Sequence, residues 1–415
     1  FRSYKSQGNF EGYLETDSYF DGTAHCKPRL FMQALLECKY KEINQLIILG
    51  TDTSSWDCFV DKDNDERDGI IELWDSLFDQ CEEKEKGKQP AGVSRENLDR
   101  LESYLAERFG LEVKIRIHSH TIDDSSSEEL FGCYMGATAL VKKGNDILFD
   151  ITHGFRSMPV LLYQSLQYSA GQQEGHSIEI VYGELDLSDR TKGRARNLSS
   201  YWHYSELTKA LHLFSSKLDG FKLAELVMKD WEKGGKAIKK LSEVVQTNFA
   251  LQIFDVSRQV RNALAAYPEN APAWLGKVKD ELEAIASIID DANKATSLLR
   301  YSEYLYAHKL NVQAVITLQV AVEAAIVTKY ASEDKLGDYD WWQKEGKQRL
   351  YNLKGENWKE MGNPLKKLER FRNQVAHGGG MDSYKKEFPQ ASNIPAIYGS
   401  GKRGVKQLLA LLTGD

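Results

Sequence analysis

The spacing of apolar residues along the sequence changes near residue 198. Before this point, four short runs are almost continuously apolar and are bounded by Gly, Asp or Ser. Such runs predict buried parallel strands, and the segments between them leave room for crossover helices, for instance at 69–80 and 95–109. We therefore expect an α/β domain with a Rossmann-like, mostly parallel sheet and helices on both faces. The four expected strands cover residues 43–49, 113–118, 147–151 and 178–182.

Beyond residue 198 the strand patterns disappear, and apolar residues recur at helical spacing. This spacing predicts an all-α C-terminal region, in which the last helix ends at the glycines 378–380. Two of the helices, joined at 309–311, are expected to form an antiparallel pair. The expected helices cover residues 207–218, 244–265, 274–289, 295–310, 312–330 and 364–377. We therefore expect an N-terminal domain at 1–195 and a helical region at 196–415, with the joint in the polar, basic segment 189–197.

Composition excludes several classes of protein. The 415-residue chain has a formal net charge of −7, so it does not coat nucleic acid through overall basicity. Its five cysteines contain no C-x-x-C pair, which argues against structural zinc and for a reducing compartment. No apolar stretch approaches the roughly 20 residues of a membrane helix, and the N-terminal region lacks the apolar core of a secretory signal. We expect a cytoplasmic protein with no membrane contact and no bound metal or other cofactor.

The densest cluster of chemistry-bearing residues is the segment DITHGFRSMP at 150–159. It follows a predicted strand and leads into a helix whose start is favoured by Ser157 and Pro159. Ligands of open α/β sheets bind where strands end, and helix N-termini attract anions. The candidate ligand contacts are Thr152, His153, Gly154 and Arg156. The alternative is a structural turn with Asp150 as a cap and an exposed histidine.

A second loop with similar chemistry is GTDTSSW at 50–56, also directly after a predicted strand. Gly50, Thr51 and Ser54 suit contacts to phosphate or ribose, and Trp56 could stack on a base. The alternative is an ordinary polar loop whose tryptophan belongs to the core, and the loop taken alone favours that alternative. Two such loops at one edge of the same sheet would favour a nucleotide site.

An acidic stretch at 61–72 has the spacing of a calcium loop but not its chemistry. Glu66 occupies the place of the required glycine, and Asp68 replaces the usual apolar residue. A solvated acidic loop is the better interpretation. His118, at the end of a predicted strand, and the nearby His120 are interpreted as structural or exposed.

The candidate catalytic motif of the C-terminal part is an R-x-x-x-x-H pattern, formed by Arg372 and His377. The pattern is weak alone, because residues five apart on a helix point about 140° away from each other. Its surroundings add weight: residues 344–372 contain nine Lys or Arg and four Asp or Glu. Basic groups and aromatic rings together suit single-stranded nucleic acid. The interleaved aromatic residues are Trp341, Trp342, Tyr351, Trp358 and Phe371. The alternatives are a solvated basic face and a capping histidine, and Glu323 is expected to form a hydrogen bond near the pair.

These motifs resemble those of a known family. The strings at 146–159 and 47–57 are similar to the ligand loops of the CARF domain in Csx-type CRISPR-associated proteins, and RNQVAH at 372–377 resembles the HEPN ribonuclease motif. The resemblance implies a type III CRISPR accessory ribonuclease, in which a CARF dimer binds a cyclic oligoadenylate, with cyclic tetra-adenylate favoured. That ligand would activate a HEPN dimer that cuts single-stranded RNA. The family's first apolar strand, with its Gly/Thr loop, has no counterpart before Tyr4, so we expect it to be absent from this sequence.

The resemblance also implies residue roles. The two loops would hold the cyclic ligand through Gly50, Thr51, Ser54, Thr152, His153, Gly154 and Arg156. Arg372 and His377 would be catalytic, and Asn373 fills the polar position often found after the arginine. Two alternatives stay open. The helical part could be a regulatory or interaction domain, or the α/β domain could be a ring nuclease that degrades its own ligand, with Thr51, Ser54 or Thr152 positioning the ribose.

Overall fold

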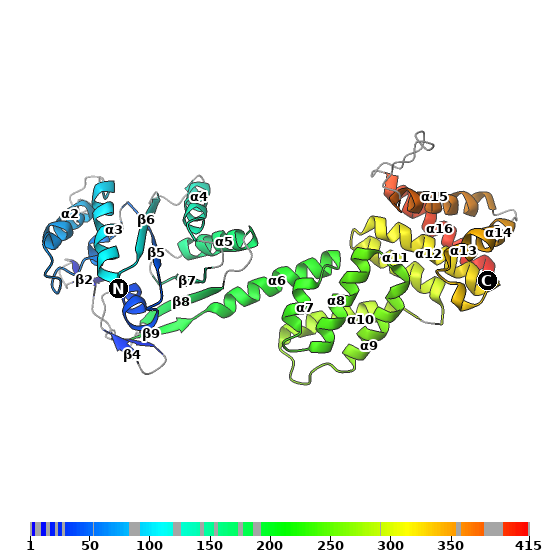
Figure 1. The fold of residues 1–415 in the computed structure, drawn as a ribbon, viewed down its shortest axis with the longest axis horizontal. Coiled ribbons are helices and arrows are strands. Elements are labelled where there is room, and N and C mark those ends of the chain that lie inside the picture. Colours follow the sequence, from blue (N-terminus) through cyan, green and yellow to red (C-terminus); the bar gives the residue numbers. More distant parts are fainter. Residues whose placement is uncertain are drawn as a thin grey trace. The chain divides into compact units, whose positions relative to one another are not determined.

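The computed structural model divides the chain into two compact units, Phe1–His203 and Tyr204–Asp415 (Figure 1). The boundary lies inside helix α6 (Ser199–Lys217), eight residues beyond the expected position at 195. The structure describes residues 2–4, 10–13, 17–20, 24–26, 30–52, 54–82, 92–118, 126–141, 145–152, 157–172, 177–185, 192–290, 292–353, 358–376 and 393–413.

All four expected strands of the first unit are present. They are β5 (Gln45–Thr51), β6 (Glu112–His118), β7 (Ile147–Asp150) and β8 (Ile178–Leu185). β5 pairs with β6 in parallel, with Thr51 opposite His118 at the carboxyl ends. β7 pairs with β8 in parallel, with Asp150 opposite Val181. Each pair therefore ends in loops at its carboxyl edge, where parallel sheets bind their ligands.

Helices cover both faces of the β5–β6 pair, as the apolar pattern predicts (Figure 1). The buried side chains of Val113 and Ile115 on β6 belong to the same core as α2 (Ile70–Glu82) and α3 (Arg95–Phe109). His118 lies at an alternate position on the strand, so it faces the other side and contacts Tyr134 of α4 (Ser126–Thr138). Both expected crossover helices are confirmed. α3 begins after the cap Ser94, and it ends at Gly110, which has a positive φ of 68°.

The expectation of a mostly parallel sheet is only partly confirmed, because the larger sheet is mixed. Its five strands have the order β4-β3-β9-β8-β7, with β3 (Asp17–Phe20) and β4 (Ala24–Cys26) from the N-terminal region. β8 and β9 (Lys192–Asn197) are antiparallel, and so are β3 and β4. A separate hairpin joins β1 (Arg2–Tyr4) to β2 (Phe10–Tyr13). The described part of the first unit is thus an α/β domain with parallel and antiparallel pairs.

Strand β9 corrects the interpretation of residues 189–197 as the joint between the domains. Gly193 is buried and Ala195 is half-buried, whereas Arg194 and Arg196 are exposed. Arg196 forms an ion pair with Glu184 of the neighbouring strand, with nitrogen and oxygen 2.6 Å apart. An antiparallel strand can keep one face in water, so small residues alternating with arginines form a strand that carries no apolar run.

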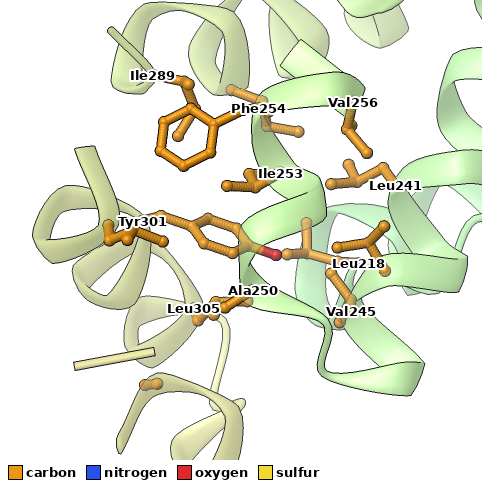
Figure 2. Close-up of a cluster of buried hydrophobic side chains, with 14 of the residues drawn as sticks. Leu218, Leu241, Val245, Ala250, Ile253, Phe254, Val256, Ile289, Tyr301 and Leu305 are labelled. Carbon is orange, nitrogen blue, oxygen red and sulfur yellow. The ribbon is translucent and has the colours of Figure 1, made fainter. Parts of the chain in front are cut away.

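The second unit is all-helical as expected, and its core runs through most of its helices. Apart from α6, the helices are α7 (Phe221–Val227), α8 (Glu232–Thr247), α9 (Ile253–Leu264), α10 (Ala273–Ile288), α11 (Lys294–Ala307), α12 (Asn311–Tyr330), α13 (Tyr339–Trp341), α14 (Lys347–Asn352), α15 (Trp358–Ala376) and α16 (Ile394–Thr413). Figure 2 shows Ile253 of α9 between Leu241 of α8 and Tyr301 of α11. The antiparallel pair α11–α12 is confirmed, with a short link in which Lys309 has a φ of 62°.

Several helices differ from the sequence expectation. The stretch 244–265 is broken into α8 and α9, because Asn248 adopts the left-handed conformation that ends helices. Helix α15 begins at Trp358, with Pro364 inside it rather than at its start. Helix α16 was not expected. Its glycines Gly401 and Gly404 let it lie close to Leu368 and Pro364 of α15, and glycines in a helix lower its sequence signal.

Helix α12 is long and apolar enough to cross a membrane by length and composition, contrary to the expectation that no segment qualifies. Gln319 and Glu323 interrupt its apolar residues, so no single apolar run is long although the mean hydropathy of the helix is high. In the most apolar window, 61% of the helix is buried inside the protein. It packs against α11, α15 and α16, as the core helix of a soluble protein does, and no other described helix passes the same test.

Candidate functional site

The loop that follows β5 is braced by its own side chains. The Thr51 backbone N–H donates to Ser54 Oγ over 2.8 Å, and the two hydroxyl oxygens lie 3.0 Å apart. The Ser54 N–H in turn donates to the Thr51 carbonyl. Thr51 is only 2% exposed, whereas Ser54 is half-buried. Ser54 therefore offers more surface to a ligand than Thr51 does, and the ligand contacts of both residues stay predictions.

Trp56 belongs to the core and does not offer a stacking surface. Its side chain is 1% exposed, and its indole N–H donates to the Thr51 carbonyl over 2.9 Å. A Cβ placed on Gly50 would lie 2.6 Å from the Trp56 ring. Only glycine fits at position 50 for this reason, so its demonstrated role is to admit the tryptophan beneath the loop. The structural interpretation of Trp56 is confirmed.

The loop that follows β7 is held by a chain of hydrogen bonds through Thr152. The Thr152 hydroxyl donates to Asp150 Oδ1 over 2.5 Å and accepts the N–H of Gly183 over 2.7 Å. The Thr152 N–H also donates to Asp150 Oδ1, over 2.8 Å. These bonds tie the end of β7 to its neighbour β8, and they use all but one of the lone pairs of the hydroxyl. A ligand contact by Thr152 stays a prediction for that one lone pair.

The carboxyl of Asp150 in this loop has a shifted pKa. Burial raises the pKa of its carboxyl above the ordinary value, although the two hydrogen bonds from Thr152 partly oppose that change. The carboxylate therefore acts as a cap for its own turn. The predicted contacts His153, Gly154 and Arg156 lie outside the described residues, whereas the predicted helix start is confirmed, since α5 (Ser157–Gln172) begins at Ser157.

The two loops are not shown to share one sheet edge. Among the described residues, β5 and β6 form their own two-stranded sheet, and no strand pairing connects them with β7. Each loop is placed at the carboxyl end of a parallel pair, as predicted. Their combination into a single nucleotide site stays a prediction.

In the second unit, α15 presents Arg372 to a carboxylate on α12. Arg372 Nη1 lies 3.6 Å from Glu323 Oε1, and the two side chains are 25% and 14% exposed. Gln319, one turn earlier on α12, donates its amide to the same oxygen over 3.4 Å. Burial raises the pKa of Glu323, while Arg372 and Gln319 lower it in part. The expectation that Glu323 lies near the R-x-x-x-x-H pattern is confirmed for its arginine.

The remaining members of that pattern are placed differently. Asn373 is exposed on α15. His377 comes directly after the last residue of α15 and lies outside the described residues, so the distance between the Arg372 and His377 side chains is not described.

Sequence reasoning missed a second polar cluster beside Arg372. Glu369, one turn earlier on α15, forms an ion pair with Lys347 of α14 and accepts a hydrogen bond from the Tyr351 hydroxyl over 3.4 Å. The spacing of Glu369 and Arg372 places them near each other on the helix surface. The three-residue interval between Glu369 and Arg372 was the sequence pattern that could have indicated this cluster.

In the acidic stretch at 61–72, two carboxylates pair with arginines. Asp65 is bonded to Arg67, and Asp61 is paired with Arg108 at 3.3 Å. The Arg67 hydrogen bonds lower the pKa of Asp65 far below its usual range. Within the described ranges, no group of three or more His, Cys, Asp and Glu side chains could hold a metal ion.

Taken together, the geometry defines a protein with an α/β unit that carries polar loops at its strand ends, followed by a helical unit with a half-buried Arg–Glu pair. Residues 4–182 match the model of the CARF domain of the CRISPR system endoribonuclease Csx1. The chain is also 23% identical, over 311 residues and 70% of its length, to the CRISPR-associated protein MJ1674 of Methanocaldococcus jannaschii. It spans 45% of the length of that relative.

These similarities relate residues 4–182 to the CARF domain of Csx1 and the chain to a CRISPR-associated protein. The R-x-x-x-x-H pattern lies beyond the matched residues, so the assignment of the helical unit to the HEPN class stays a prediction.

Proposed function

We propose that the chain is a cytoplasmic, cyclic-oligoadenylate-activated endoribonuclease that cuts single-stranded RNA without a metal ion. Under this proposal residues 1–195 sense the ligand, with cyclic tetra-adenylate favoured, and residues 196–415 cut the RNA. The observation that carries the catalytic part is the pairing of Arg372 with Glu323 on a helix rich in basic residues. A carboxylate beside a guanidinium restricts its orientation.

The proposed reaction needs only groups of the chain and the RNA. A 2′-hydroxyl loses its proton to His377, and its oxygen forms a bond to the adjacent phosphorus. The bond from phosphorus to the 5′-oxygen breaks, and that oxygen takes a proton, which leaves a 2′,3′-cyclic phosphate and a 5′-hydroxyl. Imidazole suits both transfers because its pKa lies near neutrality. Arg372 stabilises the added negative charge on the phosphate.

A single Arg–His pair per chain supplies only one histidine for the two proton transfers of this reaction. We therefore place the reaction in a homodimer, where two copies of Arg372 and His377 face each other and the second histidine protonates the leaving oxygen. The cyclic ligand would favour the arrangement in which these sites align, which is a population shift between two states of the dimer.

The test of the catalytic proposal is the chemistry of the product ends. A labelled single-stranded RNA is incubated with the protein, cyclic tetra-adenylate and excess EDTA, and the ends are identified by enzymatic treatment and mass spectrometry. We expect 2′,3′-cyclic phosphate and 5′-hydroxyl ends, and cutting by Arg372→Ala that is about 100- to 1000-fold slower. Arg403→Ala, which changes an exposed arginine on α16, serves as the control and should cut normally. Cutting abolished by EDTA, or ends with a 5′-phosphate, would exclude the proposed mechanism.

A further inference from the structure

Helix α6 is the element through which the chain leaves the first unit and enters the second. It begins at Ser199, and the boundary between the units follows His203, so residues 199–203 of the helix belong to the first unit. Because each turn of a helix is hydrogen-bonded to the next, the first turn and the residues after it move together. The covalent path from the loops of the first unit to the second unit therefore passes through the first turn of α6.

Strand β8 holds this first turn through backbone and side-chain hydrogen bonds. The Ile180 N–H donates to Ser199 Oγ over 3.0 Å, and the Ile180 carbonyl accepts the N–H of Leu198 over 2.7 Å. The Asn197 side chain accepts the Ser199 N–H and donates to Glu179 Oε1, each over 2.8 Å. The start of α6 is thereby tied to two consecutive residues of β8.

The same strand holds the loop that follows β7. The Gly183 N–H donates to the Thr152 hydroxyl over 2.7 Å. A Cβ placed on Gly183 would lie 2.6 Å from the Phe31 ring and 3.0 Å from Thr152 Cγ2, so the loop lies directly against the strand. Gly183 follows Ile180 by three residues on β8. A displacement of the loop at 150–152 therefore acts on the strand that carries the first turn of α6.

Helix α5 also contacts the first turn of α6. The Tyr163 hydroxyl donates to the Tyr201 carbonyl over 3.1 Å, and the Tyr163 ring lies edge-on to the Trp202 ring with their centres 5.6 Å apart. Edge-on aromatic pairs favour one geometry in addition to burying apolar area. Helix α5 begins at Ser157, five residues after Thr152. The helix that starts beside the β7 loop is thus joined to α6 by both a ring contact and a hydrogen bond.

We propose that the first turn of α6 is the joint through which a ligand at the β7 loop acts on the helical unit, and that Tyr163 is the positioning residue that couples α5 to this joint. The turn has two arrangements, and ligand contacts at the end of β7 favour one of them, so binding shifts the population of α6. Tyr163 makes α6 follow α5, and Ser199 makes it follow β8. This inference rests on the proposed function and specifies how activation leaves the sensor unit.

The experiment measures three quantities on the full chain, with and without cyclic tetra-adenylate. They are the ligand affinity by calorimetry, the rate of RNA cleavage, and the hydrogen exchange of the α6 amides by mass spectrometry. Tyr163→Phe removes only the hydroxyl, and Tyr163→Ala removes the ring as well. The matched control is Tyr168→Phe on the same helix, since the Tyr168 ring is 53% exposed and lies edge-on to Phe131 of α4. Circular dichroism confirms that each variant is folded.

We expect the ligand to slow exchange in α6 of the wild type and to stimulate its cleavage. The stimulation should fall about two- to tenfold in Tyr163→Phe, the size of one neutral hydrogen bond, and further in Tyr163→Ala, together with the change in exchange. Ligand affinity should stay equal or become tighter, because binding no longer has to reorient α6. The control should match wild type.

Wild-type stimulation and exchange in Tyr163→Ala would overturn this inference while leaving the ribonuclease proposal intact. Weaker ligand binding in step with the lost stimulation would also overturn it, because Tyr163 would then support the ligand site itself. A wild type that binds the ligand but does not cut would overturn the ribonuclease proposal, and the exchange of α6 would still test the joint. Failure of the wild type to bind the ligand would overturn the proposed sensor and this inference with it.

Discussion

At the scale of single residues, the proposed catalysis depends on the ion pair between Arg372 and Glu323. An arginine that stabilises a phosphate transition state must be aimed as well as charged, since an error of about 1 Å can cost a hundredfold in rate. Glu323 orients the Arg372 guanidinium, because Glu323 is largely buried and is held by Gln319 on its own helix. It is a positioning residue, because it acts through Arg372.

Changing Glu323 to glutamine should therefore lower kcat about 10- to 100-fold with little change in KM, because RNA binding is left intact while the guanidinium loses its partner. Arg372→Ala should lower kcat about 100- to 1000-fold. Steady-state kinetics on a short RNA measure both effects. Glu303→Gln is the matched control, since Glu303 of α11 forms an interhelical ion pair with Lys402 of α16 at 2.8 Å. Equal rates for Glu323→Gln and Glu303→Gln would show that the ion pair does not position the arginine.

Asp150 makes a prediction about stability and pH. Its pKa is raised by burial, so the folded state binds the proton more tightly than the unfolded state does. The stabilisation is complete below the unfolded pKa of about 4 and is lost as the pH rises through the folded pKa. Asp150→Asn keeps an oxygen for both Thr152 bonds and carries no charge. It should therefore gain stability relative to wild type as the pH rises above about 4, up to a plateau.

Thermal unfolding across a pH series measures this difference. Asp150→Ala is the contrasting variant, because it leaves the half-buried Thr152 N–H without its acceptor and should lose about 1–3 kcal/mol. A melting-temperature difference between Asp150→Asn and wild type that is constant with pH would contradict the account of the carboxylate.

The candidate site was only partly predictable at this scale. The residue types at strand ends pointed to the loops at 50–54 and 150–152, since parallel strands end at a common edge. The sequence could not show that Thr51 and Trp56 are buried, because both residue types occur in ligand loops and in cores. The partner of Arg372 was foreseeable because Glu323 interrupts an apolar helix, where a buried carboxylate needs a cation.

At the scale of elements, the close packing of α15 and α16 depends on glycines. A Cβ at Gly401 would lie 2.5 Å from Leu368 Cδ2, and Leu368 is completely buried. Gly399, on the same helix, has no atom closer than 4.0 Å to its would-be Cβ. The two positions therefore separate the effect of packing from the effect of helix propensity.

We expect Gly401→Ala to destabilise the second unit by about 1–3 kcal/mol through overpacking. Gly399→Ala should stabilise it by up to about 1 kcal/mol, because alanine favours the helix over glycine. Chemical denaturation followed by circular dichroism compares the two variants. Equal stabilities would mean that α16 does not depend on a close approach to α15.

Element types were predictable where the apolar period was clear, as in α3, in the α11–α12 pair and in the four parallel strands. Element types were missed where an element is held by local packing and its sequence has no clear apolar period. Strand β9 has small residues on its buried side and arginines on the other, so it reads as a linker. The break at Asn248 depends on one left-handed residue in a long apolar helical pattern, and the start of α15 was misplaced because proline usually marks a helix start.

At the scale of the whole molecule, the proposed function joins a sensor unit to a cutting unit. The sensor is supported by the CARF match over residues 4–182, whereas the cutting unit rests on residues of the second unit. Ligand binding to the folded sensor should raise its stability by about 2.7 kcal/mol at a ligand concentration of 100 Kd. Thermal unfolding with cyclic tetra-adenylate, and with its linear counterpart as control, measures this gain. No shift with the cyclic compound at any concentration would contradict its role as the ligand.

The decisive experiment is cleavage of a labelled single-stranded RNA in EDTA, with and without cyclic tetra-adenylate, by wild type and His377→Ala. We predict that wild type cuts only when the ligand is present, and that His377→Ala binds the ligand with unchanged affinity but does not cut. Ligand-independent cutting, or equal cutting by His377→Ala, would contradict the claim that a ligand sensed by the first unit controls a histidine-dependent ribonuclease in the second.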